Sequence, residues 1–298
     1  MYNVFFLYPK YILGTAMTKY LLLFCGLLFS FELSAQVRLL SDAELAQAHP
    51  FLSIEEALSS SDTVFKLYLW EENRTTLSTE VAKIKTIQEI WLNDNPSLDL
   101  KDAINTLVKL PVLQTLNLSG NQIKVLPAEI TKLAKLKDLA LNGNSTFIDE
   151  MDASGQGLDL KENFKLLAQN PKLTKINLAD NNITLIPNEI AGLKNLAILD
   201  LTNNQLATLP EAMGELSNLN ELVLANNPIK ELPEVLSKMK SLTKLDLRSI
   251  KLTNFMADMD KIKKMPKLKE LWIPDGLTEA DINALKKAMP KLEIISFE

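Results

Sequence analysis

The sequence predicts an α/β solenoid, a curved right-handed coil with one parallel sheet on its concave side and a mixture of helices and turns on its convex side. Three observations predict it. The pattern Leu-x-x-Leu-x-Leu-x-x-Asn recurs along most of the 298 residues, the clearest copies are 23 residues long, and a Leu-Pro or Ile-Pro step follows the pattern in several copies. Because each copy supplies one short strand, about ten strands are expected.

Residues 1–35 have the features of a signal peptide. In "MTKYLLLFCGLLFSFELSAQ" one lysine precedes an apolar run at residues 20–31, and the small pair Ser34-Ala35 follows it. The run has 12 residues, whereas a membrane span needs roughly 20, so cleavage before Gln36 is expected rather than a stable span. Either Met1 or Met17 can be the start of translation.

Composition excludes several classes of function. The chain is 47% hydrophobic, which predicts a folded protein. Its single cysteine, Cys25, lies in the expected signal peptide, so the mature chain has no disulfide, thiolate nucleophile or Cys-ligated zinc. The net charge of −5 becomes −6 when residues 1–35, with two Lys and one Glu, are removed. No basic run is visible along the sequence, which argues against nucleic acid or an anionic membrane as the main partner.

The elements follow in order from an N-terminal cap at residues 36–63. In "FLSIEEAL", Ser53 and Glu56 have the spacing of a capping box for a short helix that would cover the first coil. The repeat domain is expected at residues 64–298, with an insertion at 145–157. Its registers begin at Val64, Ile87, Leu113, Leu136, Leu173, Leu196, Leu219, Leu242, Leu268 and Leu292.

Two kinds of segment are expected on the convex side. "LPAEITKL", "IPNEIAGL", "LPEAMGEL" and "LPEVLSKM" begin at a proline and predict compact turns. Residues 98–113, residues 158–173 and the segment "LTEADINALKKAMPKL" predict helices, because an acidic or hydroxyl residue stands three positions before an Asp or Glu at each start. No coil buries enough apolar surface to fold alone, so stability belongs to the stack.

A column of asparagines ends the strands, where backbone groups are left unpaired. An amide side chain both donates and accepts, so each asparagine can satisfy backbone groups of its own coil and of the adjacent one. We therefore expect a structural role for Asn95, Asn121, Asn144, Asn181, Asn204 and Asn227. The column lapses at Ile250 and Gly276, where a less regular stack is expected.

These motifs resemble those of leucine-rich repeat proteins. The variant with Leu-Pro-x-x-Ile is similar to the class found in Ras-binding leucine-rich repeat proteins and in many bacterial ones, and the resemblance covers residues 64–297. It implies a repeat solenoid that serves as a binding scaffold. One fold of this kind serves many partners, so the resemblance does not identify the ligand.

The concave face is the expected binding surface, because variable strand positions point outward there. Exposed Trp and Tyr are typical anchors of protein or glycan contacts, although aromatic side chains of terminal coils also serve to cover the core. The candidate residues for partner binding are Tyr68, Trp70, Trp91, Asn117, Asn177, Asp200, Asp246 and Trp272. In the same strand column the last coil is expected to contribute Ser296.

The insertion "STFIDEMDASGQG" is a second candidate, since long loops in repeat arrays often bind ligands. A tolerated surface insertion is the alternative. Its candidate residues are Phe147, Ile148, Asp149, Glu150 and Asp152.

Few residues could carry catalysis. His49 is the single histidine and has no candidate base, metal or nucleophile near it in sequence. Asp200 and Asp246 share a strand position two coils apart, which places them about 10 Å from each other, near the upper limit for an inverting glycosidase pair. An ordinary solvated face is the favoured explanation, because paired surface acids are common and a catalytic pair also needs a cleft that shifts the pKa values. We therefore expect no catalytic residues, metal or cofactor.

The sequence as a whole predicts an exported, non-catalytic scaffold whose concave face binds a protein or peptide. Carbohydrate or cell-wall recognition by the same face is an alternative, as is an intracellular signalling adaptor; a hydrolase is disfavoured. The expected location is periplasmic, cell-surface or secreted. A monomer is favoured, although the last strand, "LEIISF", leaves an edge that a second copy could pair with.

Overall fold

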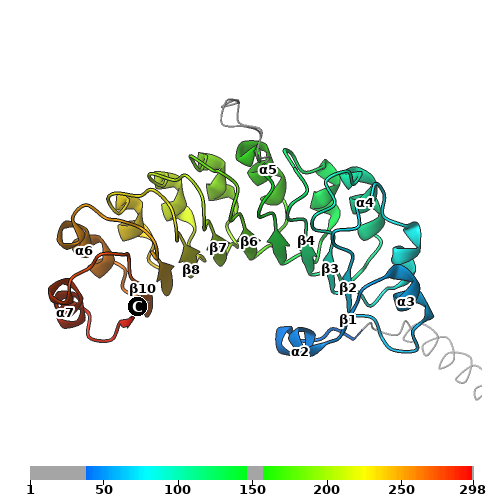
Figure 1. Cartoon of the computed structure of the whole chain (residues 1–298), viewed down its shortest axis with the longest axis horizontal. Coiled ribbons are helices and arrows are strands. Elements are labelled where there is room, and N and C mark those ends of the chain that lie inside the picture. The colour runs from blue at the N-terminus through cyan, green and yellow to red at the C-terminus, as the bar shows by residue number, and fades with distance from the viewer. Residues whose placement is uncertain (1–37, 146–156, 297–298) are drawn as a thin grey trace, which may run out of the picture. The chain divides into compact units, whose positions relative to one another are not determined.

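The computed structural model describes residues 38–145 and 157–296. The chain divides into two units at Arg38, and the second unit, Leu39–Glu298, contains the elements described below. Within this unit the coils stand side by side along an arc, with the strands on the inner side and most helices on the outer side (Figure 1).

The sheet has eleven parallel strands in the described residues, and their spatial order is their order in the sequence. Alternation of Leu or Ile with other residues forms strands β2 to β10, because the Leu and Ile side chains point to the core while the residues beside them face outward. The strands are β1 Pro50–Phe51, β2 Lys66–Tyr68, β3 Glu89–Trp91, β4 Thr115–Asn117, β5 Asp138–Ala140, β6 Lys175–Asn177, β7 Ile198–Asp200, β8 Glu221–Val223, β9 Lys244–Asp246, β10 Glu270–Trp272 and β11 Glu293–Ile295.

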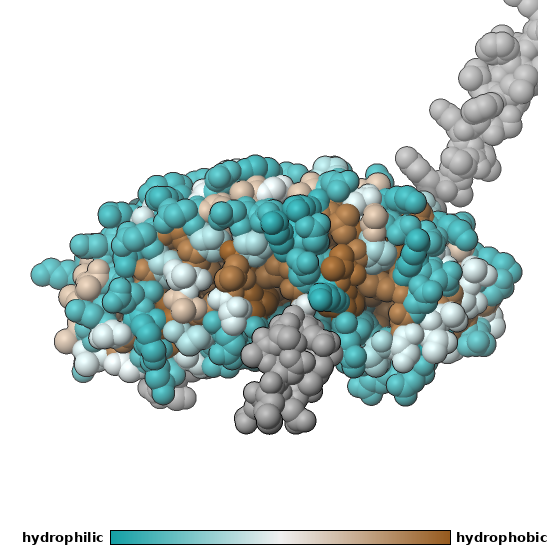
Figure 2. Space-filling view, turned by 90° about the horizontal axis from the view of Figure 1, so that it is seen from above, coloured by the Kyte–Doolittle hydropathy of each residue, from teal (hydrophilic) through white to brown (hydrophobic). Residues whose placement is uncertain are grey.

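The core is continuous from the cap to the last coil. The central leucine or isoleucine of strands β2 to β10 has 0% exposure, and the leucines of the Leu-Pro steps are buried beneath the outer side. Each coil contributes one layer, so a coil is stabilised chiefly by its two neighbours. Figure 2 shows the outer side, where hydrophilic side chains dominate and apolar surface is visible in furrows between coils.

The convex side contains both kinds of segment that the sequence predicts. Among the described residues, proline is the N-cap of four of the five short 3₁₀ helices, where its fixed backbone angle suits the first turn. The 3₁₀ helices are η1 Thr79–Lys83, η2 Ala128–Lys132, η3 Asn188–Gly192, η4 Glu211–Glu215 and η5 Glu234–Lys238, and the α-helices are α4 Leu100–Leu107, α5 Leu160–Leu167, α6 Phe255–Lys263 and α7 Glu279–Ala288.

Helix α6 was not anticipated from the sequence. Its N-cap is Asn254, whose side chain accepts a hydrogen bond from the Ala257 amide, and Phe255 and Ile262 anchor its inner face. The segment lacks the Leu-Asp-Leu opening of α4 and α5, which is why pattern comparison with those helices missed it.

The N-terminal cap contains more structure than the single short helix expected. Helix α2 (Asp42–Gln47) precedes β1, and α3 (Ile54–Ser59) follows it. Ser53 caps α3 by accepting from the Glu56 amide, but the Glu56 carboxylate accepts from the Leu52 amide rather than from Ser53, so the capping box is half formed. The cap thus adds a strand to the sheet as well as covering the first coil.

The register at the carboxyl-terminal end differs from the expectation by one residue. Ile295, not Ser296, lies opposite Trp272 in the concave column. The preceding strand pairs stay in one-to-one register through Asp246 and Trp272, so the sheet remains regular where the asparagine column lapses. Ile250 fills the asparagine position there as a fully buried apolar side chain.

The asparagines form a ladder of hydrogen bonds between coils. The Asn204 Oδ1 accepts from the amides of Asn181 and Ile183 in the preceding coil, at 3.1 and 2.9 Å. Its Nδ2 donates to the carbonyls of Leu178, Leu201 and Thr202. Comparable bonds to backbone groups of a neighbouring coil are made by Asn95, Asn121, Asn144, Asn181 and Asn227.

Candidate functional site

Three aromatic side chains form one cluster at the N-terminal end of the concave face. Tyr68 on β2 and Trp91 on β3 stack with ring centroids 4.2 Å apart, and Trp70, just after β2, lies 5.4 Å from Tyr68 and 5.7 Å from Trp91 at tilted angles. The rings meet because Tyr68 and Trp91 are direct partners in the strand register. We call Tyr68, Trp70 and Trp91 the aromatic cluster.

The aromatic cluster is partly open to solvent. Trp70 is 37% exposed, and Tyr68 and Trp91 are half-buried. The Tyr68 hydroxyl donates a hydrogen bond to the Glu89 carboxylate at 2.7 Å. Burial, this hydrogen bond and the negative charge of Glu89 together raise the pKa of Tyr68 above its ordinary value of 10.0. The phenol therefore stays protonated and fixes the orientation of its ring.

Helix α2 forms one wall of a groove beside the cluster. The groove has a volume of about 610 Å³ and lies between α2 and the concave faces of strands β3 to β7. The side chain of Gln88 bonds both backbone groups of Leu40, the Lys66 Nζ donates to the Ala46 carbonyl, and the Leu45 side chain is buried. These contacts hold α2 on the inner side of the arc (Figure 1).

The groove brings three of the predicted binding residues together. Trp91, Asn117 and Asn177 all line it, with Ala140 between the two asparagines in the strand register. The Asn117 Oδ1 accepts from the amide and hydroxyl of Ser119, which holds the side chain in place. Aromatic surface and amide groups therefore share one continuous floor.

The other predicted residues lie further along the concave face. The Asp200 Oδ1 accepts from the amide and hydroxyl of Thr202. Asp246 is buried and forms an ion pair with Arg248, whose Nε lies 2.9 Å from both carboxylate oxygens. Trp272, partly exposed on β10, is the register partner of Asp246 and is remote in sequence from the aromatic cluster.

The acidic pair considered for hydrolysis does not form an open catalytic pair. The hydrogen bond from Arg248 to Asp246 raises the pKa of the guanidinium, and the charge of Asp200 adds to this. Asp246 is thereby bound as a counter-ion rather than presented to solvent as a nucleophile or base. The interpretation of these acids as an ordinary solvated face is wrong for Asp246, which is 5% exposed.

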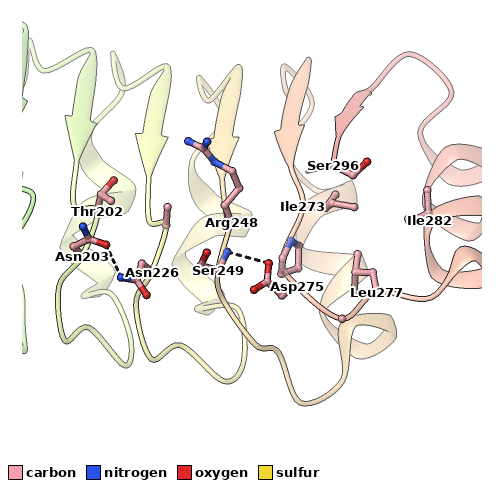
Figure 3. A pocket seen from close by; sticks show the side chains of 13 residues that line it. Thr202, Asn203, Asn226, Arg248, Ser249, Ile273, Asp275, Leu277, Ile282 and Ser296 are labelled. Carbon is pink, nitrogen blue, oxygen red and sulfur yellow. Dashed lines mark hydrogen bonds between the residues drawn. The ribbon is translucent and has the colours of Figure 1, made fainter. Parts of the chain in front are cut away.

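A second pocket, which sequence reasoning missed, opens at the carboxyl ends of strands β7 to β11. It has a volume of about 840 Å³ and is lined by polar turn residues on one side and by Ile273, Leu277 and Ile282 on the other (Figure 3). Asn203 and Asn226 are hydrogen bonded to each other at its rim, and the Ser249 amide donates to Asp275. The apolar wall comes from the long connection to α7, whose folding back over the strand ends no repeat pattern predicts.

Two predicted features lie outside the described residues. They are the signal peptide at 1–35 and the loop residues Phe147, Ile148, Asp149, Glu150 and Asp152. His49 is described; its ring meets Phe51 edge-on at 5.8 Å. Across residues 38–145 and 157–296, no group of three or more His, Cys, Asp and Glu side chains could hold a metal ion, and no helix is long and apolar enough to cross a bilayer.

The repeats match known family models. A family model described as "Leucine-rich repeat region" matches residues 148–297, and another, "Leucine Rich Repeat", matches residues 112–133. The first match covers half of the chain. The chain belongs to the leucine-rich repeat family.

Solved structures of other leucine-rich repeat proteins share the fold. A leucine-rich repeat protein of Leptospira interrogans is 28% identical with a TM-score of 0.64, over 84% of this chain and 59% of that one. An internalin of Listeria monocytogenes is 22% identical with a TM-score of 0.50, over 79% and 68% of the two chains. TLR13, solved in a complex with ssRNA13, is 23% identical with a TM-score of 0.59, over 78% and 36%.

The chain spans less than two-thirds of the Leptospira protein, and the search of the curated proteins finds no match. The leucine-rich repeat fold is generally a non-catalytic scaffold for protein interaction.

Proposed function

We propose that this leucine-rich repeat protein is a non-catalytic scaffold that binds a protein or peptide on its concave face. The observation that carries the proposal is the aromatic cluster, which stays partly exposed and adjoins the groove beneath α2. A contiguous aromatic surface is costly to leave in water, and Trp and Tyr are the side chains most enriched at binding hot spots.

The groove suits an extended peptide. It crosses strands β3 to β7 and offers Asn117 and Asn177 as amide donors and acceptors beside apolar surface. Lys137 and Thr174, at the edge of the same groove, add a charge and a hydroxyl. A peptide can therefore place an apolar side chain against the aromatic cluster while its backbone bonds the amides.

A displayed random-peptide library, selected on the immobilised protein, tests this proposal. Trp91→Ala should weaken the selected peptides by roughly thirtyfold, because truncating a central aromatic anchor commonly costs 2 kcal/mol or more. Trp272→Ala, at the other end of the concave face, is the matched control and should leave their affinity within about twofold. Peptides that bind both variants equally would contradict the assignment of the site.

Glycan recognition is the alternative for the same surface, since sugar rings stack on aromatic faces. In the aromatic cluster Tyr68 and Trp91 use one face each to stack on one another, which leaves less ring surface for a sugar. A glycan array probed with the same variants separates the two. Binding to glycans that is lost in Trp91→Ala, without any peptide selected, would replace the peptide proposal.

We also propose that the chain is exported and cleaved after Ala35. The apolar run at 20–31 and the pair Ser34-Ala35 support this, as does the start of the compact unit at Leu39, just beyond the cleavage point. Intact-mass measurement on protein from its native source should show a chain that begins at Gln36. A mass that retains residues 1–35 would contradict export by this route.

A further inference from the structure

One edge of the solenoid collects lysines that are scattered in the sequence. The edge is formed by the seven residues that precede each strand from β3 to β11, which include the last residues of several convex-side helices, and we call it the basic edge. Its only carboxylate is Glu215. Its lysines are Lys83, Lys85, Lys109, Lys132, Lys135, Lys137, Lys172, Lys194, Lys238, Lys240, Lys263, Lys264, Lys267, Lys269, Lys286, Lys287 and Lys291.

Most of these lysines are not neutralised by the protein itself. Four of them form ion pairs: Lys83 with Glu80, Lys194 with Glu215, Lys238 with Glu211 and Lys263 with Asp260. The remaining lysines of the basic edge are exposed and form no ion pair with described residues. Their charges are therefore available to an outside partner.

The fold aligns these charges. Backbone bonds run from coil to coil along the edge; for example, the Thr174 amide donates to the Lys137 carbonyl and the Lys269 amide donates to the Thr243 carbonyl. Coils follow one another at about 4.8 Å, so lysines that are 23 or more residues apart in sequence become near neighbours. This is the basic surface that inspection of the linear sequence failed to find.

The opposite edge does not share this charge. The seven residues that follow each strand from β2 to β10 include Asp94, Asp180 and Asp275 as well as Lys124, Lys230 and Lys251. Acids and bases are mixed there, and the whole chain has a net charge of −5. Positive charge is thus concentrated on one edge of an acidic protein. Such an uneven distribution of charge orients the molecule in an electrostatic field.

The shape of the basic edge fits a flat partner. The coils lie along an arc, and the short strands run roughly along the line of sight, so the strand ends of one side all face the same way (Figure 1). In the coil before β10 the lysines stand at several positions, Lys263, Lys264, Lys267 and Lys269, which makes a broad strip rather than a single row. A flat surface such as a membrane can contact every coil at once, whereas a linear polymer would have to bend along the arc.

The chemistry of the edge favours phosphate headgroups over bases. Its segments contain no aromatic residue for stacking on nucleobases, and lysine binds phosphate as a point charge without bidentate recognition. None of the exposed large hydrophobic side chains among the described residues lies on it, so contact is electrostatic rather than inserted.

We propose that the basic edge docks the leucine-rich repeat unit on its side against an anionic membrane surface. In this orientation the concave face stands perpendicular to the membrane. The basic edge and the groove share Gln114, Lys137 and Thr174, so the docking is tested with lysines that do not line the groove.

Cosedimentation with lipid vesicles tests this docking. The protein is the chain from Gln36 to Glu298, which contains the compact unit with its own core and cap and lacks the apolar run that would insert by itself. Vesicles of phosphatidylglycerol and phosphatidylcholine should bind it, vesicles of phosphatidylcholine alone should not, and added salt should release it. The triple variant Lys264→Gln, Lys267→Gln, Lys269→Gln should bind roughly a hundredfold more weakly, since each lysine near an anionic surface contributes about fivefold.

The matched control is Lys124→Gln, Lys230→Gln, Lys251→Gln, which removes the same charge from the opposite edge and should bind like the unaltered protein. Thermal melts of both variants verify that they are folded. Failure to bind anionic vesicles, or equal loss in both triple variants, would overturn the docking surface. Single-stranded RNA is added as a competitor. If it displaces the protein when its phosphate groups are less concentrated than those of the lipid, the partner is a linear polyanion instead of a membrane.

Discussion

Tyr68 and Trp91 stack nearly face to face across strands β2 and β3, with ring centroids 4.2 Å apart and planes inclined by 16°. They are register partners, and Glu89 on the same strand as Trp91 fixes the tyrosine through its hydroxyl. The contact joins the first full coil to the second on the concave face, which is exposed to solvent and is the proposed binding surface. It is both a structural contact and part of the proposed binding surface.

Because Trp91 stacks on Tyr68, Trp91→Ala should lower the stability of the protein as well as its affinity for a partner. We expect the free energy of unfolding to fall by about 1 to 2 kcal/mol, because aromatic pairs contribute about 0.5 to 1.5 kcal/mol beyond the area they bury. Urea denaturation measures it, and Trp91→Phe, which keeps a ring, is the control that should recover most of the loss. A loss above about 4 kcal/mol would mean that Trp91 is a core residue rather than a surface anchor.

The raised pKa of Tyr68 predicts a dependence on alkaline pH. In the folded protein the phenol holds its proton, whereas in the unfolded chain it ionises near its ordinary value of 10.0. The group therefore contributes stability that is fully present below pH 10.0 and is lost as the pH rises above that value. Urea midpoints across this range should fall more steeply for the unaltered protein than for Tyr68→Phe. Parallel curves for the two proteins would contradict the burial and the bond to Glu89.

The stack of coils could be predicted from the sequence because the repeated leucines and asparagines are the residues whose contacts cause the coils to stack. A leucine that must face the core and an asparagine that must bond the next coil recur once in every coil of the solenoid. The fold class therefore follows from their spacing alone. The aromatic cluster was also predictable, since alternation places Tyr68 and Trp91 outward on neighbouring strands. Family models and solved structures confirm the fold.

What the sequence did not predict depends on contacts that interrupt the repeat. Helix α2 lies on the concave side because Lys66 donates to its Ala46 carbonyl and Gln88 bonds the backbone of Leu40 just before it. Neither contact is part of the repeating pattern. The basic edge was missed for another reason. Lysines one coil apart look isolated in the sequence, and only stacking brings them together.

The asparagine ladder predicts a large loss of stability for one substitution. Asn204→Leu removes two acceptor and three donor contacts with buried backbone groups of two coils. We expect the free energy of unfolding to fall by at least about 3 kcal/mol, because each unsatisfied buried group costs about 1 to 3 kcal/mol. Asn283→Leu, at an exposed asparagine on α7, should change it by less than about 0.5 kcal/mol. Equal effects of the two substitutions would contradict the structural role of the ladder.

A second set of buried polar side chains predicts a comparable effect on the convex side. Asn163 on α5 accepts from the Leu126 amide at 2.8 Å and donates to the Lys124 carbonyl at 3.0 Å. Asp258 on α6 accepts from the Leu232 amide at 3.0 Å. In both places a side chain on the helix of the next coil thus accepts from the amide of the leucine in the Leu-Pro step.

Asn163→Leu therefore keeps the number and branching of the side-chain heavy atoms but leaves the Leu126 amide and the Lys124 carbonyl without partners. The free energy of unfolding should fall by about 2 to 4 kcal/mol, the cost of two unsatisfied buried groups offset in part by added apolar burial. Asn105→Leu, on the exposed side of α4, is the matched control and should be nearly neutral. Hydrogen exchange gives the local readout: the Leu126 amide should exchange faster in Asn163→Leu while the amides of strands β8 to β10 keep their protection. Unchanged protection of Leu126 would show that another group satisfies it and that the helix side chain is dispensable.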